Sequence, residues 1–257
     1  MNRVVIVGSG NVAESLAQAV AGCGAQLVQI YARNEARAQE IARIAGCSWG
    51  CRPEQLAVAD LYLVAVSDRA VAEVVDSLPI PEDAAVAHTA GSVPLEALPA
   101  RFVRRAVFYP LQTFTKGRRV DFSQVPIFIE AVAPELQEEL ETFARRISRQ
   151  VFSADSARRA KLHLAAVFAC NFANHMFVLG ERLLGDAGLD FDVLKPLIAE
   201  TTEKALGAAS PAGMQTGPAV RGDLATQQRH TAMLDDELLR TLYTAISRSI
   251  WETSRKI

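Results

Sequence analysis

Residues 4–13 read VVIVGSGNVA, and residues 14–20, which follow at once, have the pattern of a helix. The apolar run is typical of a buried strand that ends in a glycine turn. Gly8 permits a tight turn from strand to helix, Gly10 lets backbone amides approach a pyrophosphate, and Ala13 lets the helix pack closely on the strand. The N-terminus of the helix then faces the phosphate charge. The pattern predicts a dinucleotide site, and a plain turn without a ligand is the alternative.

The chain has 257 residues, of which half are hydrophobic, with 27 basic and 29 acidic residues and a net charge of −2. This length is enough for two modest domains, each with its own core. The apolar content excludes a disordered chain, and the scattered basic residues give no patch for nucleic acid. We therefore expect a small-molecule substrate as the partner and no nucleic acid.

No signal peptide fits the N-terminus, because Met1-Asn2-Arg3 leads into only four apolar residues before the glycine turn. We therefore expect a cytoplasmic protein. The long apolar run at 162–179 could be mistaken for a membrane span, but it contains two histidines and two asparagines, which are costly in lipid. The run is interpreted as a buried helix of a soluble domain, without a membrane.

The four cysteines, Cys23, Cys47, Cys51 and Cys170, lack paired CxxC spacing. A cytosolic chain gives no reason to expect disulfides. We interpret them as small core residues and predict no metal site.

Strand and helix signals alternate through the first half of the chain, as in a doubly wound parallel sheet. Strand-like segments lie at 4–7, 26–31, 60–66, 84–88, 101–109, 125–130 and 151–152, and helix-like segments lie at 14–20, 35–45, 68–78 and 134–149. After Ala154 the strand signals stop, and 156–184, 191–208 and 224–254 are helix-like. The prediction is an α/β Rossmann-type domain with a mostly parallel sheet at 1–153, which binds the nucleotide, followed by an all-α domain at 154–257 for substrate and dimerisation.

The end of the second strand indicates which nicotinamide cofactor the site prefers. NAD-selective sites place an acidic side chain there for the ribose 2′-hydroxyl, whereas NADP sites offer positive charge to a 2′-phosphate. Here the strand ends Tyr31-Ala32-Arg33-Asn34, and Arg37 follows about one helical turn later. A pair of arginines suits a phosphate, so NADP is predicted. The alternative for Arg37 is a solvated helix surface.

Ligands of such sheets bind beyond the carboxyl ends of the strands, where residues 66–68 and 88–92 are expected to complete the crevice. Asp68 could instead cap the helix that follows it. The residues predicted to bind the cofactor are Gly8, Ser9, Gly10, Asn11, Val12, Arg33, Asn34, Val66, Ser67, His88, Ala90 and Gly91.

The helix at 156–184 carries few polar residues, and at about 100° per residue they share roughly half of its circumference. We predict catalytic roles there for Lys161, His163 and Asn171. Lys161 or His163 would donate the proton that a reduced carbonyl or imine needs, although the two lie nearly opposite each other on the helix. The alternative is a set of structural hydrogen bonds to neighbouring loops.

Two loops and one further helical residue are predicted to bind the substrate. The loop at 109–114 contributes Gln112 and Thr113, and the loop at 215–223 contributes Thr216, Gly217 and Arg221. Asn174 would join them from the long helix. The alternative for the second loop is an ordinary Gly-Pro turn with a surface contact between Arg221 and Asp223.

Five segments together resemble a known bacterial family. They are GSGNVA at 8–13, HTAGS at 88–92, YPLQTF at 109–114, the segment from Lys161 to Asn171, and TGPAVRGD at 216–223. The resemblance is to Rossmann-like NADP-dependent oxidoreductases with a C-terminal helical domain of unknown function, which is similar to that of 6-phosphogluconate dehydrogenase. These proteins are related to pyrroline-5-carboxylate reductase, ketopantoate reductase and β-hydroxyacid dehydrogenases.

The chain departs from these patterns at two positions. Tyr109 stands where the family resemblance implies a histidine, and Ala165 stands where the β-hydroxyacid dehydrogenases have an asparagine four residues after their lysine. The mechanism of those dehydrogenases therefore does not transfer directly.

The expected function is an NADP-dependent oxidoreductase that transfers hydride between C4 of the nicotinamide and a carbonyl or imine carbon of a small polar substrate. A non-catalytic NADP-binding sensor or regulatory protein is the alternative. An apolar helical domain also favours a homodimer. Leu238, Leu242, Ile246 and Ile250 form an apolar stripe that either meets a second subunit or packs inside its own.

Overall fold

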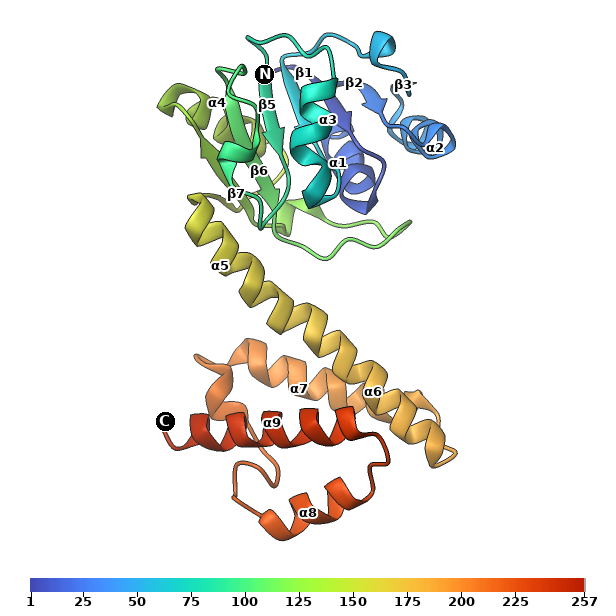
Figure 1. Cartoon of the computed structure of the whole chain (residues 1–257), viewed down its shortest axis with the longest axis vertical. Coiled ribbons are helices and arrows are strands. Elements are labelled where there is room, and N and C mark those ends of the chain that lie inside the picture. The colour runs from blue at the N-terminus through green and yellow to red at the C-terminus, as the bar shows by residue number, and fades with distance from the viewer. Residues whose placement is uncertain (257) are drawn as a thin grey trace. The chain divides into compact units, whose positions relative to one another are not determined.

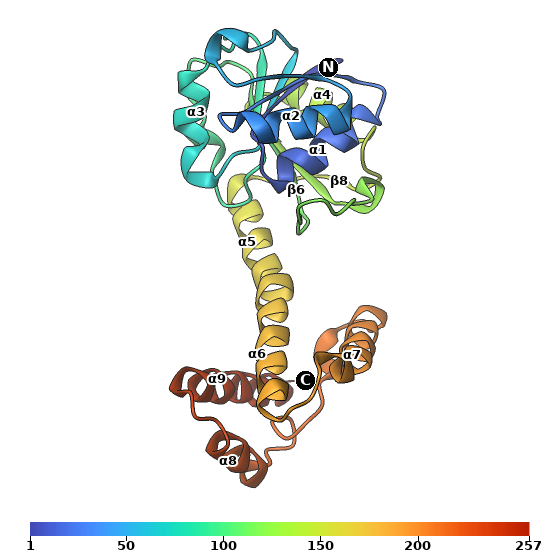
Figure 2. The ribbon, with the colours of Figure 1, turned by 90° about the vertical axis from the view of Figure 1, so that its right-hand side faces the viewer.

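The computed structural model describes residues 1–256 and divides into two compact units, Met1–Asn174 and His175–Ile257. The first unit is an α/β sandwich built on one sheet, and the second is helical (Figures 1 and 2). The α/β fold class with a helical C-terminal part is confirmed.

The sheet of the first unit has eight strands in the order β3-β2-β1-β4-β5-β6-β7-β8. The strands are β1 Arg3–Val7, β2 Gln26–Tyr31, β3 Ser48–Gly50, β4 Leu61–Val64, β5 Ala85–His88, β6 Arg105–Pro110, β7 Ile127–Ala131 and β8 Val151–Ser153. All neighbours are parallel except β6 and β7. The chain changes direction across the sheet between β1 and β4, and the carboxyl ends of these strands form the crevice in which such sheets bind nucleotides.

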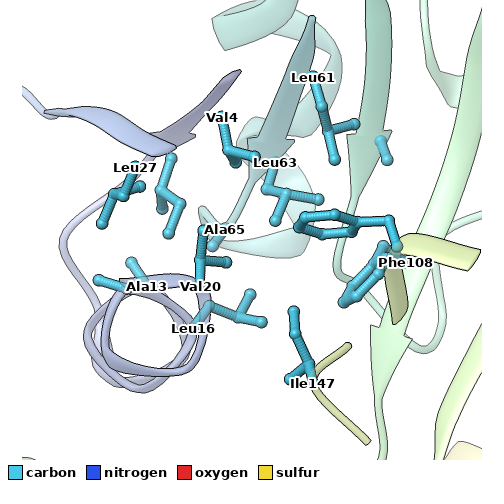
Figure 3. Close-up of a cluster of buried hydrophobic side chains, with 14 of the residues drawn as sticks. Val4, Ala13, Leu16, Val20, Leu27, Leu61, Leu63, Ala65, Phe108 and Ile147 are labelled. Carbon is cyan, nitrogen blue, oxygen red and sulfur yellow. The ribbon is translucent and has the colours of Figure 1, made fainter. Parts of the chain in front are cut away.

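The central strands bury both faces, so their side chains alternate between two cores. Val4 and Ile6 of β1 belong to the core under α1 (Asn11–Ala21), α2 (Glu35–Ala45) and α4 (Pro134–Ala144), part of which Figure 3 shows. Val5 and Val7 belong to the core under α3 (Val71–Ser77). Each fully buried large aliphatic side chain contributes about 1.5–3 kcal/mol of transfer free energy, which explains the continuous apolar runs in the sequence.

Two strands and one helix of the first unit differ from the sequence expectation. The edge strand β3 was not predicted, because it has three residues and two of them are exposed. The strand expected at 101–109 begins only at Arg105, because Phe102 forms a turn with Pro99. The helix expected at 68–78 begins as a 3₁₀ turn at Asp68–Ala70 and becomes α-helical at Val71.

A continuous helical segment of 31 residues runs from Ser156 to Asp186. It comprises α5 (Ser156–Ala166), a π-helical turn at Val167–Phe172 and α6 (Ala173–Asp186), and Asp155 caps its start by accepting from the Arg158 amide at 2.7 Å. The π turn fits more residues into a turn than an α-helix does, so the uniform 100° spacing assumed for the polar residues is wrong beyond Val167. Asn171, Asn174 and His175 are therefore rotated relative to Lys161 and His163.

The prediction that this helix is buried is wrong for the single chain. None of the most apolar 18-residue window is buried, although its mean hydropathy is 1.5, and Phe168 is 63% exposed. The reason is that packing against the helix at Glu237–Ser254 covers only part of Ala173–Asp186, whose side chains stay half-buried or exposed. Within residues 1–256 it is the one helix that is long and apolar enough to cross a membrane, by length and composition alone.

The second unit contains the rest of α6, α7 (Lys195–Gly207), α8 (Leu224–Ala232), α9 (Glu237–Ser254), and 3₁₀ turns at Phe191–Leu194 and Pro211–Met214. The single helix expected at 224–254 is interrupted before Asp236, whose carboxylate accepts from the Leu238 amide at 2.8 Å and caps α9. In the described part of this unit, the buried hydrophobic side chains are Ala219 and Leu239. The unit thus has very little core of its own.

All four cysteines are free thiols. Cys23, Cys47 and Cys51 are half-buried, and burial raises the pKa of the Cys47 thiol. Cys170 is exposed, so its interpretation as a core residue is wrong, because it lies on the uncovered long helix. Residues 1–256 contain no cluster of three or more histidine, cysteine or acidic side chains that could hold a metal ion.

Candidate functional site

The glycine turn after β1 is held by a close approach of two backbones. Gly8 has φ of 131°, and its amide donates to the carbonyl oxygen of Tyr31 at 2.8 Å. A Cβ atom on Gly8 would lie 2.1 Å from the carbonyl oxygen of Ala65 at the end of β4. Only glycine fits both the backbone conformation and the space.

The turn leads into a helix start that lacks a side-chain cap. Gly10 occupies the N-cap position of α1 with φ of −77°, and no side chain bonds to the first amides of the helix. A Cβ atom on Gly10 would meet nothing within 4 Å. The helix therefore presents unsatisfied N–H groups and the positive end of its dipole to open space, which is the arrangement that binds a pyrophosphate.

A cleft of about 600 Å³ lies over this turn. It is lined by Val7, Gly8, Ser9, Gly10, Asn11, Val12, Tyr31, Ala32, Arg33, Asn34, Ala65, Val66, Ser67, Ala70, Val74, Gln112 and Phe114. The structure thus brings together the predicted residues of the glycine turn and of the ends of β2 and β4. Among these described lining residues, Arg33 alone carries a charge.

Arg37 does not act as the expected second phosphate anchor. Its guanidinium pairs with Glu14 of α1 and with Glu40 at 2.5 Å, and its side chain is mostly buried. The Glu14 side chain is also buried and needs a countercharge, which explains why Arg37 turns towards it. Asn34 has a structural task as well, because its side chain caps α2 by accepting from the Arg37 amide at 3.1 Å.

The loop after β6 is tied to the glycine turn. The side-chain amide of Asn11 donates to the carbonyl oxygen of Phe114 at 3.0 Å. This bond brings Gln112 to the cleft, whereas Thr113 does not line it and instead donates its amide to the Gln112 side chain at 2.8 Å.

At the end of β5 the predicted residues lie deeper. His88 is completely buried, and its Nδ1 accepts from the Ala90 amide at 3.2 Å. Burial, with a smaller effect of the Arg159 charge, lowers the pKa of His88 to about 4, so its ring is neutral at pH 7. Because both side chains are buried, His88 and Ala90 do not line the cleft. Asp68 does not cap the following helix either, since its carboxylate accepts from the Ser92 hydroxyl.

A second group of residues meets at the carboxyl ends of β5 and β6. The Tyr109 hydroxyl lies 3.2 Å from Nδ1 of His163, and the two rings are arranged edge to face with centroids 6.3 Å apart. Gly91 lies against both, because a Cβ atom there would be 2.8 Å from His163 Nδ1 and 2.9 Å from the Tyr109 hydroxyl oxygen. Tyr109 is 7% exposed, and burial raises its pKa. Tyr109 was not predicted as a site residue, although it precedes the PLQTF motif at a strand end.

The start of α5 is anchored by a buried arginine. Arg159 is completely buried, pairs with Glu130 of β7, and donates to the carbonyl oxygen of Val93 at 2.5 Å. Ser156 donates its hydroxyl to Glu130 at 2.9 Å. These bonds fix α5 against β7 and the loop after β5, and so place His163 one turn further along the helix. No pattern in the sequence identifies Arg159 as buried.

The other predicted residues of the long helix do not join this group. Lys161, Asn171 and Asn174 are exposed. Lys161 is two residues from His163, so the two side chains leave the helix on different faces. Their predicted roles stay predictions.

In the second unit, an apolar cavity of about 460 Å³ is lined by α6, α9 and the loop before α8. Thr216 and His230 line it, and His230 Nδ1 lies 2.8 Å from the Tyr243 hydroxyl. Leu242, Ile246 and Ile250 also line it, whereas Leu238 is exposed. Gly217 has φ of 105° in the loop, and Arg221 is exposed. The predicted substrate roles of this loop stay predictions.

Comparison with known families assigns both parts of the chain. Residues 3–90 match the family described as "NADP oxidoreductase coenzyme F420-dependent", and residues 125–250 match a domain of unknown function, DUF2520. The comparison with curated proteins found no match.

Solved structures extend the assignment to the whole chain. A crystal structure from Bacteroides fragilis, described as a "putative NADP oxidoreductase", is 40% identical, covers 98% of each chain and has a TM-score of 0.88. A protein from Thermotoga maritima is 21% identical over 98% of each chain, with a TM-score of 0.75. A pyrroline-5-carboxylate reductase from Coxiella burnetii is 14% identical over 98% of this chain and 97% of its own, with a TM-score of 0.57. The last two show the fold alone. With the Bacteroides protein, the chain belongs to the oxidoreductase family that joins an NADP oxidoreductase-type N-terminal domain to a C-terminal DUF2520 domain.

Proposed function

We propose that the protein is an NADP-dependent oxidoreductase that transfers hydride between the nicotinamide and a carbonyl or imine carbon of a small polar substrate. One observation carries the cofactor part of this proposal. The cleft combines an uncapped helix start, suited to a pyrophosphate, with Arg33 as its one charged lining residue among those described. An acidic residue that would select a free ribose hydroxyl is absent from the same described lining.

The residues present fit the dinucleotide. The amides that follow Gly10 would hold the pyrophosphate, and Arg33 would hold the 2′-phosphate at the end of β2. Val66 and Ser67 line the part of the cleft beyond the end of β4. When bound, the nicotinamide supplies or accepts the hydride.

Arg33→Ala is expected to weaken NADPH binding about 10- to 100-fold, because a charge-assisted contact is worth about 1.5–3 kcal/mol. NADH binding should change less than threefold. Calorimetric titration of both cofactors measures the difference. Arg43→Ala is the matched control, since Arg43 is an exposed arginine on α2 that does not line the cleft. Equal affinities of the unmodified protein for NADPH and NADH would contradict the selectivity.

His163 is the best supported of the predicted proton donors. It lies beside Gly91 and Tyr109 at the carboxyl ends of the strands, while Lys161 and Asn171 are exposed elsewhere on the helix. In the reducing direction, an imidazolium would give its proton to the substrate oxygen or nitrogen as hydride reaches the adjacent carbon, and water would then restore the proton.

Turnover separates the enzyme from a non-catalytic sensor. A panel of ketoacids and cyclic imines should include a compound that oxidises NADPH, and His163→Ala should lower that rate about 100- to 10,000-fold without changing NADPH affinity. NADPH binding without turnover of any panel member would favour the sensor.

We also propose that the protein acts as a homodimer built on its helical part. The long helix exposes Leu164, Phe168 and Phe172, and the second unit buries few apolar side chains in its described part. An exposed apolar surface of this kind marks a site that packs against another protein or a membrane. The asparagines and histidines along the same helix make lipid a costly partner. A second copy offers the same apolar surface and closes the assembly through a twofold axis.

Phe168→Asp is expected to convert the dimer into a monomer, because it places a charge in the centre of this surface. Light scattering coupled to size exclusion should then give 27.8 kDa in place of about twice that mass. Val58→Asp is the control, because Val58 is a 68% exposed apolar residue of the first unit, and this variant should remain dimeric. A monomeric unmodified protein that sediments with lipid vesicles would contradict the proposal.

A further inference from the structure

We propose that Tyr109 is a positioning residue that holds Nδ1 of His163 and leaves Nε2 as the ring nitrogen that faces the substrate. The role of Nε2 towards a substrate rests on the proposed function. The contact between Tyr109 and His163 does not, because it is present in the free protein. The Tyr109 hydroxyl is 3.2 Å from Nδ1. No other hydrogen-bond partner of that hydroxyl occurs within residues 1–256.

The surroundings of Tyr109 make its ring a fixed point. It belongs to the core under α3, and it packs against Phe128 with ring centroids 6.4 Å apart. Its hydroxyl is at the strand end, where Gly91 lies close to both members of the pair. A buried hydroxyl needs a partner, and the His163 nitrogen is the one it has in the described chain.

His163, in contrast, is half-buried and projects from α5, whose start is fixed by the ion pair of Arg159 and Glu130. A histidine held at one nitrogen presents the other in a defined direction. Because Nδ1 is engaged with the tyrosine and lies against Gly91, Nε2 is the nitrogen left for a ligand.

A tyrosine suits this task in both charge states of the imidazole. A hydroxyl can donate to Nδ1 of the neutral ring and can accept from Nδ1–H of the imidazolium. The charged groups that act on Tyr109 are Arg159 and Asp68. Burial keeps Tyr109 protonated at neutral pH, since it raises the phenol pKa more than Arg159 lowers it. Within residues 1–256, the hydrogen-bond partner of the His163 ring is thus a neutral one.

The test is Tyr109→Phe, which keeps the aromatic packing and removes the bond. In the free protein, nitrogen-15 NMR should show a displaced His163 Nδ1 resonance and a smaller change at Nε2. With an active substrate, kcat should fall about 10- to 100-fold with KM within threefold, as expected when a proton donor is misdirected rather than removed.

Tyr62→Phe is the matched control. Tyr62 is also a buried tyrosine of the sheet, and its hydroxyl donates to the carbonyl oxygen of Ala57 at 2.9 Å. This variant should lose similar stability and leave the His163 resonances unchanged. Gly91→Ala is a second test variant. Its Cβ would push Tyr109 and His163 apart while both side chains remain, so the Nδ1 resonance of His163 should shift in this variant as well.

An Nδ1 resonance that is unchanged in both Tyr109→Phe and Gly91→Ala overturns the proposal, and so does an unchanged kcat in Tyr109→Phe. Failure of the proposed function looks different. In that case no panel compound is turned over by the unmodified protein, while the NMR comparison still decides whether Tyr109 holds the ring.

Discussion

Gly8→Ala should lower the free energy of unfolding by about 3–5 kcal/mol, a large part of the roughly 5–15 kcal/mol that a domain has. Two costs add. An alanine held at φ of 131° is strained by about 1–3 kcal/mol. Its Cβ would also lie 2.1 Å from the backbone oxygen of Ala65, and a backbone carbonyl in a buried strand end cannot rotate away as a side chain could. Urea denaturation followed by circular dichroism measures the loss.

Gly10→Ala separates the structural role of the glycine turn from its role in binding. Gly10 has φ of −77° and open space where a Cβ would go, so this variant should stay within about 1 kcal/mol of the unmodified protein. Its methyl group would occupy the approach to the helix N-terminus, and NADPH affinity should fall at least about 100-fold. If Gly8→Ala proved as stable as Gly10→Ala, the turn would have to relax without cost, and the account of Gly8 would be wrong.

Arg159→Met should destabilise the protein by about 3–5 kcal/mol, because it leaves the Glu130 carboxylate largely buried without its countercharge. The methionine fills part of the volume, so the effect reports the lost charge and hydrogen bonds more than a cavity. The bond to the Val93 carbonyl oxygen is lost as well, which frees the start of α5 from the loop after β5. Thermal and urea unfolding measure the stability.

The ion pair of Arg145 and Glu141, in which the arginine is exposed, provides the control for Arg159. These side chains are 2.8 Å apart within α4 and its C-terminal end, and the arginine is 57% exposed. Arg145→Met should cost less than about 1 kcal/mol, as is usual for solvent-exposed ion pairs. Equal losses in the two arginine variants would show that burial of Arg159 does not matter. Adding Glu130→Gln to Arg159→Met should recover part of the loss, because it removes the uncompensated charge.

The first half of the fold could be predicted because its signals are local. A strand, a glycine turn and a helix start occupy only the residues from Val4 to Ala13, and each has its own sequence preference. The boundaries of β2 and α2 agree with the prediction for the same reason. The lining of the cleft by Arg33 also follows from a local rule, since Arg33 lies two positions after the last residue of a predicted strand.

The rest depends on contacts that sequence spacing cannot reveal. Tyr109 and His163 are 54 positions apart and meet only because a strand end and a helix converge. The pairing of Arg37 with Glu14 likewise depends on the packing of two helices. The sequence did not predict the exposure of the long helix. An apolar run has the same sequence pattern whether residues of its own chain or another molecule pack against it.

Few hydrophobic side chains are buried in the described part of the second unit, and this affects how the chain folds and assembles. The first unit closes its two cores with its own strands and helices, so its folding follows the kinetics of one molecule. Under the proposed dimer, the helical part completes its core only on meeting another chain, and that step is second order. The melting temperature of the helical part should therefore rise with protein concentration, while that of the sheet and the helices that cover it should not. Dilution alone, without heating, should then dissociate the dimer and unfold the helical part.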